Sequence, residues 1–201
     1  ELAAEKIPEI ARATAAAGTW NVPTQVLIEA RIDATSIVEL RNRPGMQYMP
    51  AATVERWAAA KETLLAERDF DSGVAALAIE LRRTLILELH NAGAGLLLGS
   101  DSPQVFNVPG YSIHEELDTL VASGLTPYEA LRTGTVAVAE FLAGNGGTVA
   151  VGRDADLVLL DANPLDDIRN ARRIHGVVLK GTWHSADALG KRLSRYKSSD
   201  E

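Results

Sequence analysis

Apolar positions recur at helical spacing in three stretches of the first half of the chain. Pro8 and Gly18 frame the first stretch, and helices favour proline in the opening turn and glycine just past the end. Residues 54–65 and 72–90 carry apolar side chains three and four positions apart, which places them on one helical face. We therefore predict three helices here, with less regular chain between the first and the second.

Two short apolar segments alternate with these helices and are predicted to be strands. Residues 19–27 form the first, although Pro23 indicates a break near its end, because proline lacks the N–H group that a sheet uses. Residues 96–98 are three leucines bounded by glycines, a run typical of a strand buried on both faces of a parallel sheet. Asp101 follows this run directly.

Helix-start signals dominate the next segment. Ser112 and Glu115 have the spacing of a capping box, in which the two side chains bind the first free N–H groups of a helix. Thr126 and Glu129 repeat the same spacing. We expect one helix to begin at each pair, and a further helix over residues 135–142.

The pattern changes after residue 144, where short apolar segments alternate with turns rich in glycine, asparagine and proline. Residues 148–151, 157–160 and 174–179 are predicted to be strands of a small all-β annex. Residues 185–196 have the pattern of a last amphipathic helix, and the polar residues 197–201 are expected to fray.

These patterns divide the chain into three parts. Residues 1–145 are an α/β unit, residues 146–184 the β annex, and residues 185–201 a C-terminal helix and tail. Strands that alternate with helices in this order are typical of α/β folds with a parallel sheet.

Composition and charge exclude several classes of protein. The 201 residues are 46% hydrophobic and 23% charged, as in an ordinary globular domain with a small addition. A formal net charge of −7 without a basic stripe argues against nucleic acid as a partner. We expect no membrane segment, because no apolar run approaches the roughly 20 residues that span a bilayer. The chain has no cysteine, so histidine, aspartate or glutamate would hold any metal.

The cellular compartment stays open. The chain begins at Glu1 without signal-peptide features, and its original N-terminus is not visible. A soluble protein of either the cytoplasm or a secreted or periplasmic location fits the sequence.

Asp101 carries the clearest indication of chemistry. Catalytic groups of α/β proteins gather at the carboxyl ends of parallel strands, and Asp101 follows the leucine run there. Taken alone, an aspartate at this place is more often a turn former or a cap for the next helix. A catalytic role predicts that its side chain opens onto a cavity.

Four motifs in this order resemble the amidohydrolase superfamily, in particular its imidazolonepropionase-like and prolidase-like metal-dependent hydrolases. They are Gly-Thr-Trp-Asn-Val-Pro-Thr at 18–24, Gly-Ser-Asp-Ser at 99–102, Gly-Leu-Thr-Pro-Tyr-Glu-Ala-Leu at 124–131, and Gly-Arg-Asp-Ala-Asp-Leu-Val-Leu-Leu-Asp at 152–161. Each motif is weak alone, but their order and spacing are specific together. The resemblance extends from Pro8 to about His184.

The resemblance implies the C-terminal part of a TIM-like (β/α)8 metal-dependent hydrolase barrel plus a small β-sandwich annex. Residues 19–27 would be strand seven and residues 94–99 strand eight. The strand-eight aspartate of these enzymes, here Asp101, ligates the metal, accepts a proton from the metal-bound water and returns it to the departing nitrogen. We expect the divalent metal to be Zn²⁺, which makes water acidic enough to attack at neutral pH.

The other metal ligands of the family are missing from this sequence. Its histidines are His90, His114, His175 and His184, and no two of them form a His-x-His pair. We expect His90, His175 and His184 to be structural. The remaining ligands and strands should therefore come from the rest of the same barrel, and the chain from a longer enzyme. A homo-oligomer is compatible with the sequence.

Four further residues are candidate substrate contacts. His114 lies at the loop-to-helix junction after strand eight, and Thr24 ends strand seven. Tyr48 lies in a loop that could cover a ligand, and Ser102 flanks the strand-end aspartate. Each has a structural alternative: an exposed helix residue, a turn shaped by proline, a buried loop anchor, and a serine bonded to loop backbone groups.

The sequence thus predicts a metal-dependent hydrolase that acts on carbon–nitrogen bonds of a cyclic amide or dipeptide-like small molecule. The alternative is a non-catalytic, amidohydrolase-like binding or scaffold protein that has lost its metal ligands. The histidines that distinguish the two would lie upstream of this chain.

Overall fold

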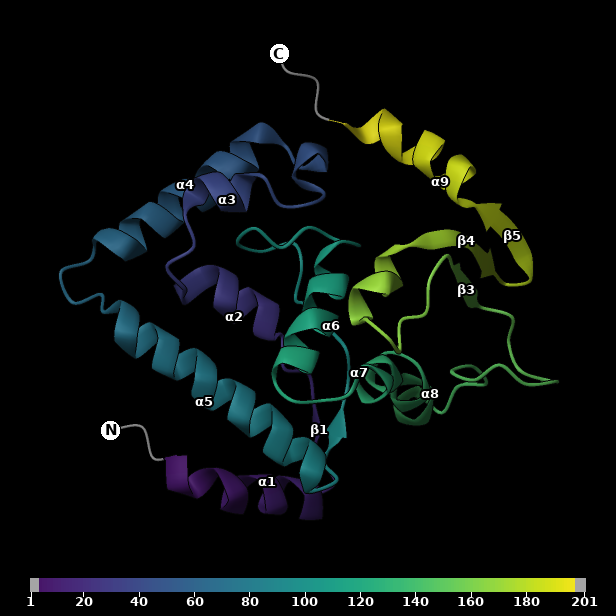
Figure 1. The fold of residues 1–201 in the computed structure, drawn as a ribbon, viewed down its shortest axis with the longest axis horizontal. Coiled ribbons are helices and arrows are strands. Elements are labelled where there is room, and N and C mark those ends of the chain that lie inside the picture. Colours follow the sequence, from purple (N-terminus) through teal and green to yellow (C-terminus); the bar gives the residue numbers. More distant parts are fainter. Residues whose placement is uncertain (1–3, 198–201) are drawn as a thin grey trace.

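The computed structural model describes residues 4–197 and has a mixed α/β architecture (Figure 1). Its α-helices are α1 (Ile7–Ala16), α2 (Gln25–Ile32), α3 (Ile37–Arg41), α4 (Ala51–Ala66), α5 (Ser72–Asn91), α6 (Ser112–Ala122), α7 (Pro127–Thr133), α8 (Val136–Leu142) and α9 (Ala186–Leu193). Its strands are β1 (Trp20–Asn21), β2 (Gly95–Leu96), β3 (Leu157–Leu160), β4 (Ile174–Leu179) and β5 (Thr182–Ser185). Short 3-10 helices are η1 (Ala4–Lys6), η2 (Met46–Tyr48), η3 (Ile168–Arg172) and η4 (Ser194–Tyr196).

Strands β1 and β2 form a two-stranded parallel sheet that joins segments far apart in the sequence. Trp20 pairs with Gly95, and a β-carbon at Gly95 would lie 2.5 Å from the Trp20 ring. The two strands can therefore approach each other only with glycine at this position. The amide of Leu97 extends the pairing, because it donates to the Asn21 carbonyl at 2.9 Å. The predicted parallel arrangement is confirmed.

The first strand is much shorter than the prediction of residues 19–27, which is wrong beyond β1. Pro23 has no N–H to give to a sheet, and Thr24 has a left-handed backbone with φ 47°, which ends the extended segment. The chain then enters α2, whose first two backbone amides donate to the carboxylate of Glu116. A group distant in the sequence thus stabilises a helix where the local pattern indicates a strand.

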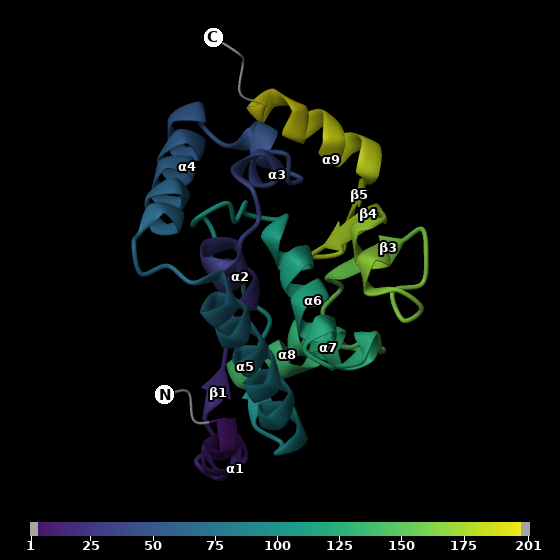
Figure 2. The same cartoon turned by 60° about the vertical axis from the view of Figure 1, so that its left-hand side comes forward.

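Helices α1, α2, α5 and α6 pack against one another beside the short sheet (Figures 1 and 2). Helix α5 contacts α1, α2 and α6, and α2 also contacts α6. The main core is built by α1, α5, β2, α6, α7 and η3. Its buried residues are Ala11, Ile86, Leu89, Leu96, Leu117, Leu120, Leu125, Ala130, Ile168 and Ala171. The three helices predicted in the first half of the chain are confirmed as α1, α4 and α5.

A second, smaller core joins α3, η2 and α4 to the loop that follows β2. Its buried members are Leu40, Met46, Ala58, Phe106 and Val108. The sequence predicts less regular chain before α4, but α3 begins there with a capping box formed by Ser36 and Glu39. This core fixes one side of the loop that carries the candidate site.

Lys61 of α4 is a buried charged residue with 1% exposure. Its Nζ donates to the carbonyl oxygens of Ala30 at 3.0 Å and Arg31 at 3.1 Å, near the end of α2. Burial lowers the pKa of Lys61, while the nearby Asp33 carboxylate acts in the opposite direction. The lysine satisfies the carbonyls that a helix end leaves free.

The annex is a three-stranded antiparallel sheet in the order β3-β4-β5. Lys180 and Gly181, both with positive φ, join β4 and β5 in a tight hairpin. The Trp183 ring covers Gly176, where a β-carbon would lie 2.1 Å from it. The sequence pattern misses β5, because this hairpin, the pairs with β4 and the contacts with α9 stabilise it.

The predicted strand over residues 148–151 is wrong. This segment is irregular and turn-like, and Val149 and Val151 are 86% and 106% exposed. A strand needs a neighbour to accept its backbone hydrogen bonds, and among the described residues none pairs with this segment. Within residues 4–197 the annex therefore has one sheet layer, whereas a β-sandwich has two.

The two predicted capping boxes have different outcomes. Thr126 and Glu129 form a complete box at the start of α7, as predicted. The Ser112–Glu115 box is wrong, because Ser112 lies inside α6 and the cap residue is Tyr111. The Ser112 hydroxyl instead hydrogen-bonds to Ser100, and this tertiary partner removes it from the helix end.

The C-terminal helix is confirmed as α9, which begins with Ser185 as its cap and has no buried residue. Of the predicted tail, residues 198–201 lie outside the described part of the chain.

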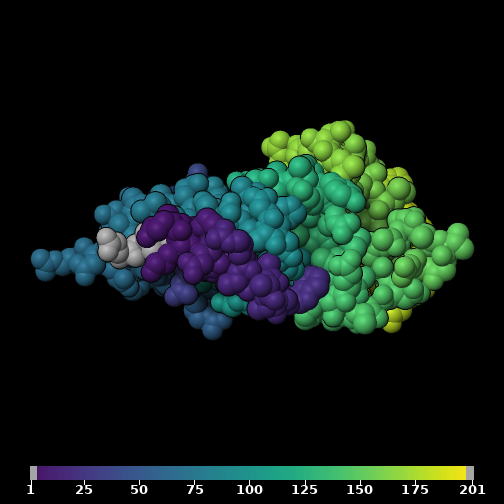
Figure 3. Space-filling view, turned by 90° about the horizontal axis from the view of Figure 1, so that it is seen from below, coloured from purple at the N-terminus to yellow at the C-terminus, as the bar shows by residue number. Residues whose placement is uncertain are grey.

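Seen from below, the molecule is elongated, with α1 in purple across one face and the annex at one end (Figure 3). Among the described residues, no helix is long and apolar enough to cross a membrane.

Candidate functional site

Asp101 lies just beyond the carboxyl end of β2, as the sequence predicts. Its side chain is exposed, and its φ of 52° lies in the left-handed region, which aspartate tolerates better than most residues. Oδ2 accepts a hydrogen bond from Nε2 of Gln104 at 2.7 Å. Oδ1 accepts none from residues 4–197, so one carboxylate oxygen is held and the other is open.

The backbone before Asp101 is fixed by buried polar groups. The hydroxyls of Ser100 and Ser112 share a hydrogen bond of 2.8 Å. Asn107 donates from Nδ2 to the carbonyl oxygen of Ser100, also at 2.8 Å. Both Asn107 and Ser112 have 0% exposure. The position of Asp101 is therefore set by the residues around it, although its own side chain faces solvent.

Ser102 is half-buried, and no hydrogen bond joins it to Asp101 in the described structure. The contact to the carboxylate comes instead from Gln104, which sequence reasoning missed. Its spacing of three residues from an aspartate in a loop is a weak signal, because many such pairs never meet. Ser102 remains a predicted substrate contact.

Thr24 follows β1 at the same edge of the sheet as Asp101 follows β2, because the two strands are parallel. It is half-buried, and its side chain makes no capping bond to α2. Its neighbour Gln25 points inward with 0% exposure and binds Glu29 and Arg82. Of these two neighbours, Thr24 is therefore the candidate for substrate contact.

Glu116 of helix α6 fixes the start of α2, which follows β1 in the chain. Its fully buried carboxylate accepts the amides of Gln25 at 3.0 Å and Val26 at 2.7 Å. Burial raises the pKa of Glu116, while the two backbone amides act in the opposite direction. Arg82 adds a bond from Nη2 to the Pro23 carbonyl at 2.9 Å. No local pattern reveals this role, since the partners are about 90 residues away.

His114 lies in the first turns of α6 and is half-buried. Burial lowers its pKa, the charge of Arg172 lowers it further, and Asp118 raises it. Its Nδ1 is buried and has no hydrogen-bond partner among the described residues. Arg172 of η3 and Asp118 form an ion pair beside it. The structure joins His114 to this pair and not to Asp101, and its substrate contact remains a prediction.

Tyr48 lies in η2 and is half-buried. Its ring stacks on that of Tyr111, with 6.0 Å between the centroids. Tyr111 covers Gly45, where a β-carbon would lie 2.5 Å from the ring. Burial, followed by the proximity of Tyr48, raises the pKa of Tyr111. This packing supports the role of a loop anchor and does not test a substrate contact.

Two of the histidines predicted to be structural have carboxylate partners. His90 lies 3.0 Å from Glu129 Oε1, and His175 Nδ1 lies 2.9 Å from Asp161 Oδ1. His184 is a half-buried residue of β5. Among residues 4–197, no three histidine, aspartate or glutamate side chains form a group that could hold a metal.

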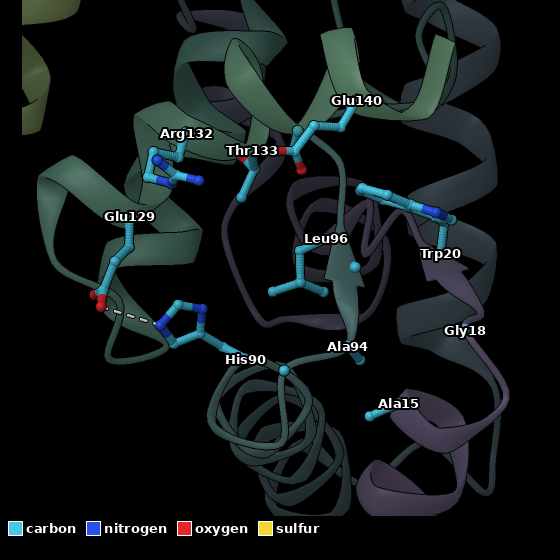
Figure 4. Close-up of a pocket in the computed structure, with 13 residues that line it drawn as sticks. Ala15, Gly18, Trp20, His90, Ala94, Leu96, Glu129, Arg132, Thr133 and Glu140 are labelled. Carbon is cyan, nitrogen blue, oxygen red and sulfur yellow. Dashed lines mark ion pairs between the residues drawn. The ribbon is translucent and has the colours of Figure 1, made fainter. Parts of the chain in front are cut away.

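A cavity of about 390 Å³ lies at the opposite end of β2 from Asp101 (Figure 4). Its lining includes Trp20, Gly95 and His90, and the His90–Glu129 pair closes one side. The Asp101 carboxylate is exposed and does not line this cavity, and a cavity at Asp101 itself stays a prediction.

The family model described as the amidohydrolase family matches residues 1–184, and the chain belongs to this family. None of the curated proteins searched matches the chain.

Solved structures share the fold. A bottromycin amidohydrolase is 24% identical with a TM-score of 0.71, over 89% of this chain and 40% of the other. A Xaa-Pro dipeptidase with bound methionine is 17% identical with a TM-score of 0.59, over 89% and 37%. A putative prolidase from Bifidobacterium longum is 24% identical with a TM-score of 0.56, over 88% and 40%. The chain thus spans about two fifths of the length of these similar structures.

Proposed function

We propose that this chain is the C-terminal part of a TIM-like barrel hydrolase that acts on carbon–nitrogen bonds. In this proposal β1 and β2 are barrel strands seven and eight, and the remaining strands come from the rest of the same barrel. The observation that carries the proposal is the exposed carboxylate of Asp101 at the carboxyl edge of a parallel strand in an amidohydrolase chain.

A divalent metal, with Zn²⁺ as our proposal, fits this carboxylate only as one ligand of several. A zinc site generally needs at least three protein ligands, and the described residues bring no such group together. Asp101 offers a negative charge with Oδ1 open, which suits a metal ligand. The metal, when bound, would supply a water that is acidic enough to react at neutral pH.

The chain's own contribution is the movement of a proton. The carboxylate of Asp101 would take up the proton of the attacking water and return it to the departing nitrogen. Such a leaving group needs a proton, because an amide anion is too basic to depart at neutral pH. Thr24, which follows β1 at the same edge of the sheet, is one candidate for substrate contact, and His114, Tyr48 and Ser102 are the others.

We propose a cyclic amide or a dipeptide-like molecule as substrate. The names of similar structures, a Xaa-Pro dipeptidase and a bottromycin amidohydrolase, support this class. Both names denote cleavage of amide-type carbon–nitrogen bonds.

The test uses the complete barrel enzyme and a panel of dipeptides and cyclic amides. Asp101→Asn keeps the shape of the side chain but removes its charge and its capacity to accept the proton. We expect turnover to fall by several orders of magnitude with little change in folding. Comparable turnover in this variant, with metal content verified, would contradict the role of Asp101. A wild-type protein that binds these molecules without hydrolysing them would indicate the scaffold alternative.

A further inference from the structure

We propose that Gln104 and Asn107 are positioning residues for Asp101, so that the loop after β2 presents one defined carboxylate oxygen, Oδ1, to the metal and the substrate. This inference rests on the function proposed above for Asp101. It assigns to two residues, neither of which reacts, the task of keeping the reacting group in one orientation.

Gln104 acts on the side chain directly. Its Nε2 donates to Oδ2 at 2.7 Å, and within residues 4–197 the Asp101 carboxylate accepts no other hydrogen bond. An amide donor is uncharged, so it orients a carboxylate without neutralising it, whereas lysine or arginine would compete with a metal cation. The contact therefore occupies Oδ2 and leaves both Oδ1 and the negative charge available.

Asn107 acts on the backbone at both ends of this contact. Its Nδ2 donates to the carbonyl oxygen of Ser100, the residue before Asp101. Its backbone amide donates to the carbonyl of Gln104, and these two residues form an isolated antiparallel bridge. One buried asparagine thus fixes the peptide that precedes the carboxylate and the residue that binds it.

Packing alone does not explain an asparagine at this place. Asn107 has 0% exposure, and its Oδ1 is buried without a hydrogen-bond partner in the described structure. A side chain without an unpaired acceptor would fill the same volume at a lower cost. The Nδ2 bond to the Ser100 carbonyl is the feature that an apolar side chain could not supply.

The backbone of the loop supports this view. Asp101 and Phe106 both have left-handed backbones, with φ of 52° and 57°. Residues other than glycine remain in this region only where their surroundings determine it. Phe106, at 1% exposure, anchors the loop in the second core. Asn107 and Ser112 fix the start of the loop through hydrogen bonds to Ser100. The conformation at Asp101 is therefore imposed by the whole loop.

The experiment compares variants of the complete barrel enzyme. Gln104→Met removes the donor to Oδ2 with a side chain of similar length, and Asn107→Leu removes the donor to Ser100. The matched control is Ser123→Ala, which deletes a buried hydroxyl at the C-cap of α6 that bonds the Thr119 carbonyl outside the loop. For each variant we would measure kcat, KM, the melting temperature, and the Co²⁺ dissociation constant by equilibrium dialysis.

We expect kcat to fall about 10- to 100-fold in both loop variants, with KM changed less than about threefold, because a displaced reacting group affects the chemical step first. The Co²⁺ dissociation constant should rise in both. Ser123→Ala should lower the melting temperature and leave kcat and the Co²⁺ constant unchanged. In an Asp101→Asn background, Gln104→Met should change neither kcat nor the Co²⁺ dissociation constant further, because Gln104 acts only through Asp101.

Three results would overturn the inference. The first is a wild-type kcat and Co²⁺ affinity in Gln104→Met while Asp101→Asn is inactive, which would leave the proposed function intact. The second is an equal effect of Gln104→Met with and without Asp101. The third is full turnover in Asp101→Asn, which would remove the proposed function and this inference together. If Asn107→Leu does not fold, Gln104→Met still decides, since its side chain is exposed.

Discussion

The carboxylate of Glu116 accepts the backbone amide of Val26 at 2.7 Å, although the two residues are 90 positions apart. The amide of Gln25 donates to the same carboxylate at 3.0 Å. Helix α2 has no side-chain cap from its own N-cap residue, Thr24, so Glu116 satisfies N–H groups that would otherwise be unpaired. These bonds hold the start of α2, and Thr24 before it, against α6, the helix that follows Asp101.

Glu116→Gln should lower the free energy of unfolding by about 2–4 kcal/mol, because a glutamine presents an N–H donor to one of the two amide donors. Urea unfolding followed by circular dichroism measures this. Glu115→Gln is the matched control, because Glu115 is half-buried on the same turn and its carboxylate accepts no hydrogen bond from residues 4–197. Its effect should stay within about 0.5 kcal/mol. Equal losses in the two variants would contradict the role of Glu116.

Acid should destabilise the protein through Glu129. Hydrogen bonds from Thr126, and then the contact with His90, lower the pKa of Glu129 to about 2. In the unfolded chain this carboxyl has its ordinary pKa of 4.5, so the stabilisation is present above pH 4.5 and is lost as the pH falls toward 2. The carboxylate is partly exposed, and solvent screening reduces the contribution to about 1 kcal/mol, or roughly 2–4 °C in melting temperature.

Melting curves of the wild type and Glu129→Gln between pH 6 and pH 2 measure this contribution. The difference in melting temperature between the two proteins should be largest near pH 6 and vanish near pH 2. A difference that is independent of pH would show that the Glu129 carboxylate does not supply it.

Gly95→Ala should destabilise the protein by about 2 kcal/mol or more, because the added β-carbon would lie 2.5 Å from the Trp20 ring and force β1 away from β2. Gly190→Ala, in α9, is the matched control, because a β-carbon there meets nothing within 4 Å. It should be neutral or stabilising, by up to about 1 kcal/mol. Similar behaviour of the two alanine variants in urea would argue against the close contact of β1 and β2.

Residues 1–201 alone should neither hold zinc in stoichiometric amount nor hydrolyse the substrate panel. Their described part offers one open carboxylate oxygen at the proposed site and no group of three metal ligands. The pair β1–β2 also has edges without a partner strand among residues 4–197, which favours self-association. Elemental analysis, turnover assays and size-exclusion chromatography test this. Stoichiometric zinc together with robust turnover would contradict the proposal of an incomplete site.

The sequence predicts the elements that local interactions stabilise. The helical spacing over 72–90 and the cap formed by Thr126 and Glu129 both occur in the structure, because their partners lie within a few residues. The prediction for residues 19–27 is wrong because Glu116, far away in the chain, stabilises a helix there. A pattern of neighbouring residues contains no information about such a contact.

In the candidate site, too, the sequence predicts what local signals determine and misses what depends on distant contacts. The place of Asp101 after a buried parallel strand could be predicted, because a leucine run bounded by glycines is a local signal. The roles of Gln104 and Asn107 could not, since they depend on the three-dimensional course of the loop. The cavity expected at Asp101 needs strands that are not part of this chain in our proposal.

The pairing of β1 with β2 also has a consequence for biosynthesis. Asn21 and Gly95, which touch across the strand pair, are 74 residues apart. A ribosome adds about 5–20 residues each second, so Gly95 is made roughly 4–15 s after Asn21. During this interval the Trp20 ring and the edge of β1 have no partner from β2, and chaperones that bind apolar segments can reach them. Slower translation lengthens this interval, and the yield of folded protein should therefore depend on elongation rate between these two positions.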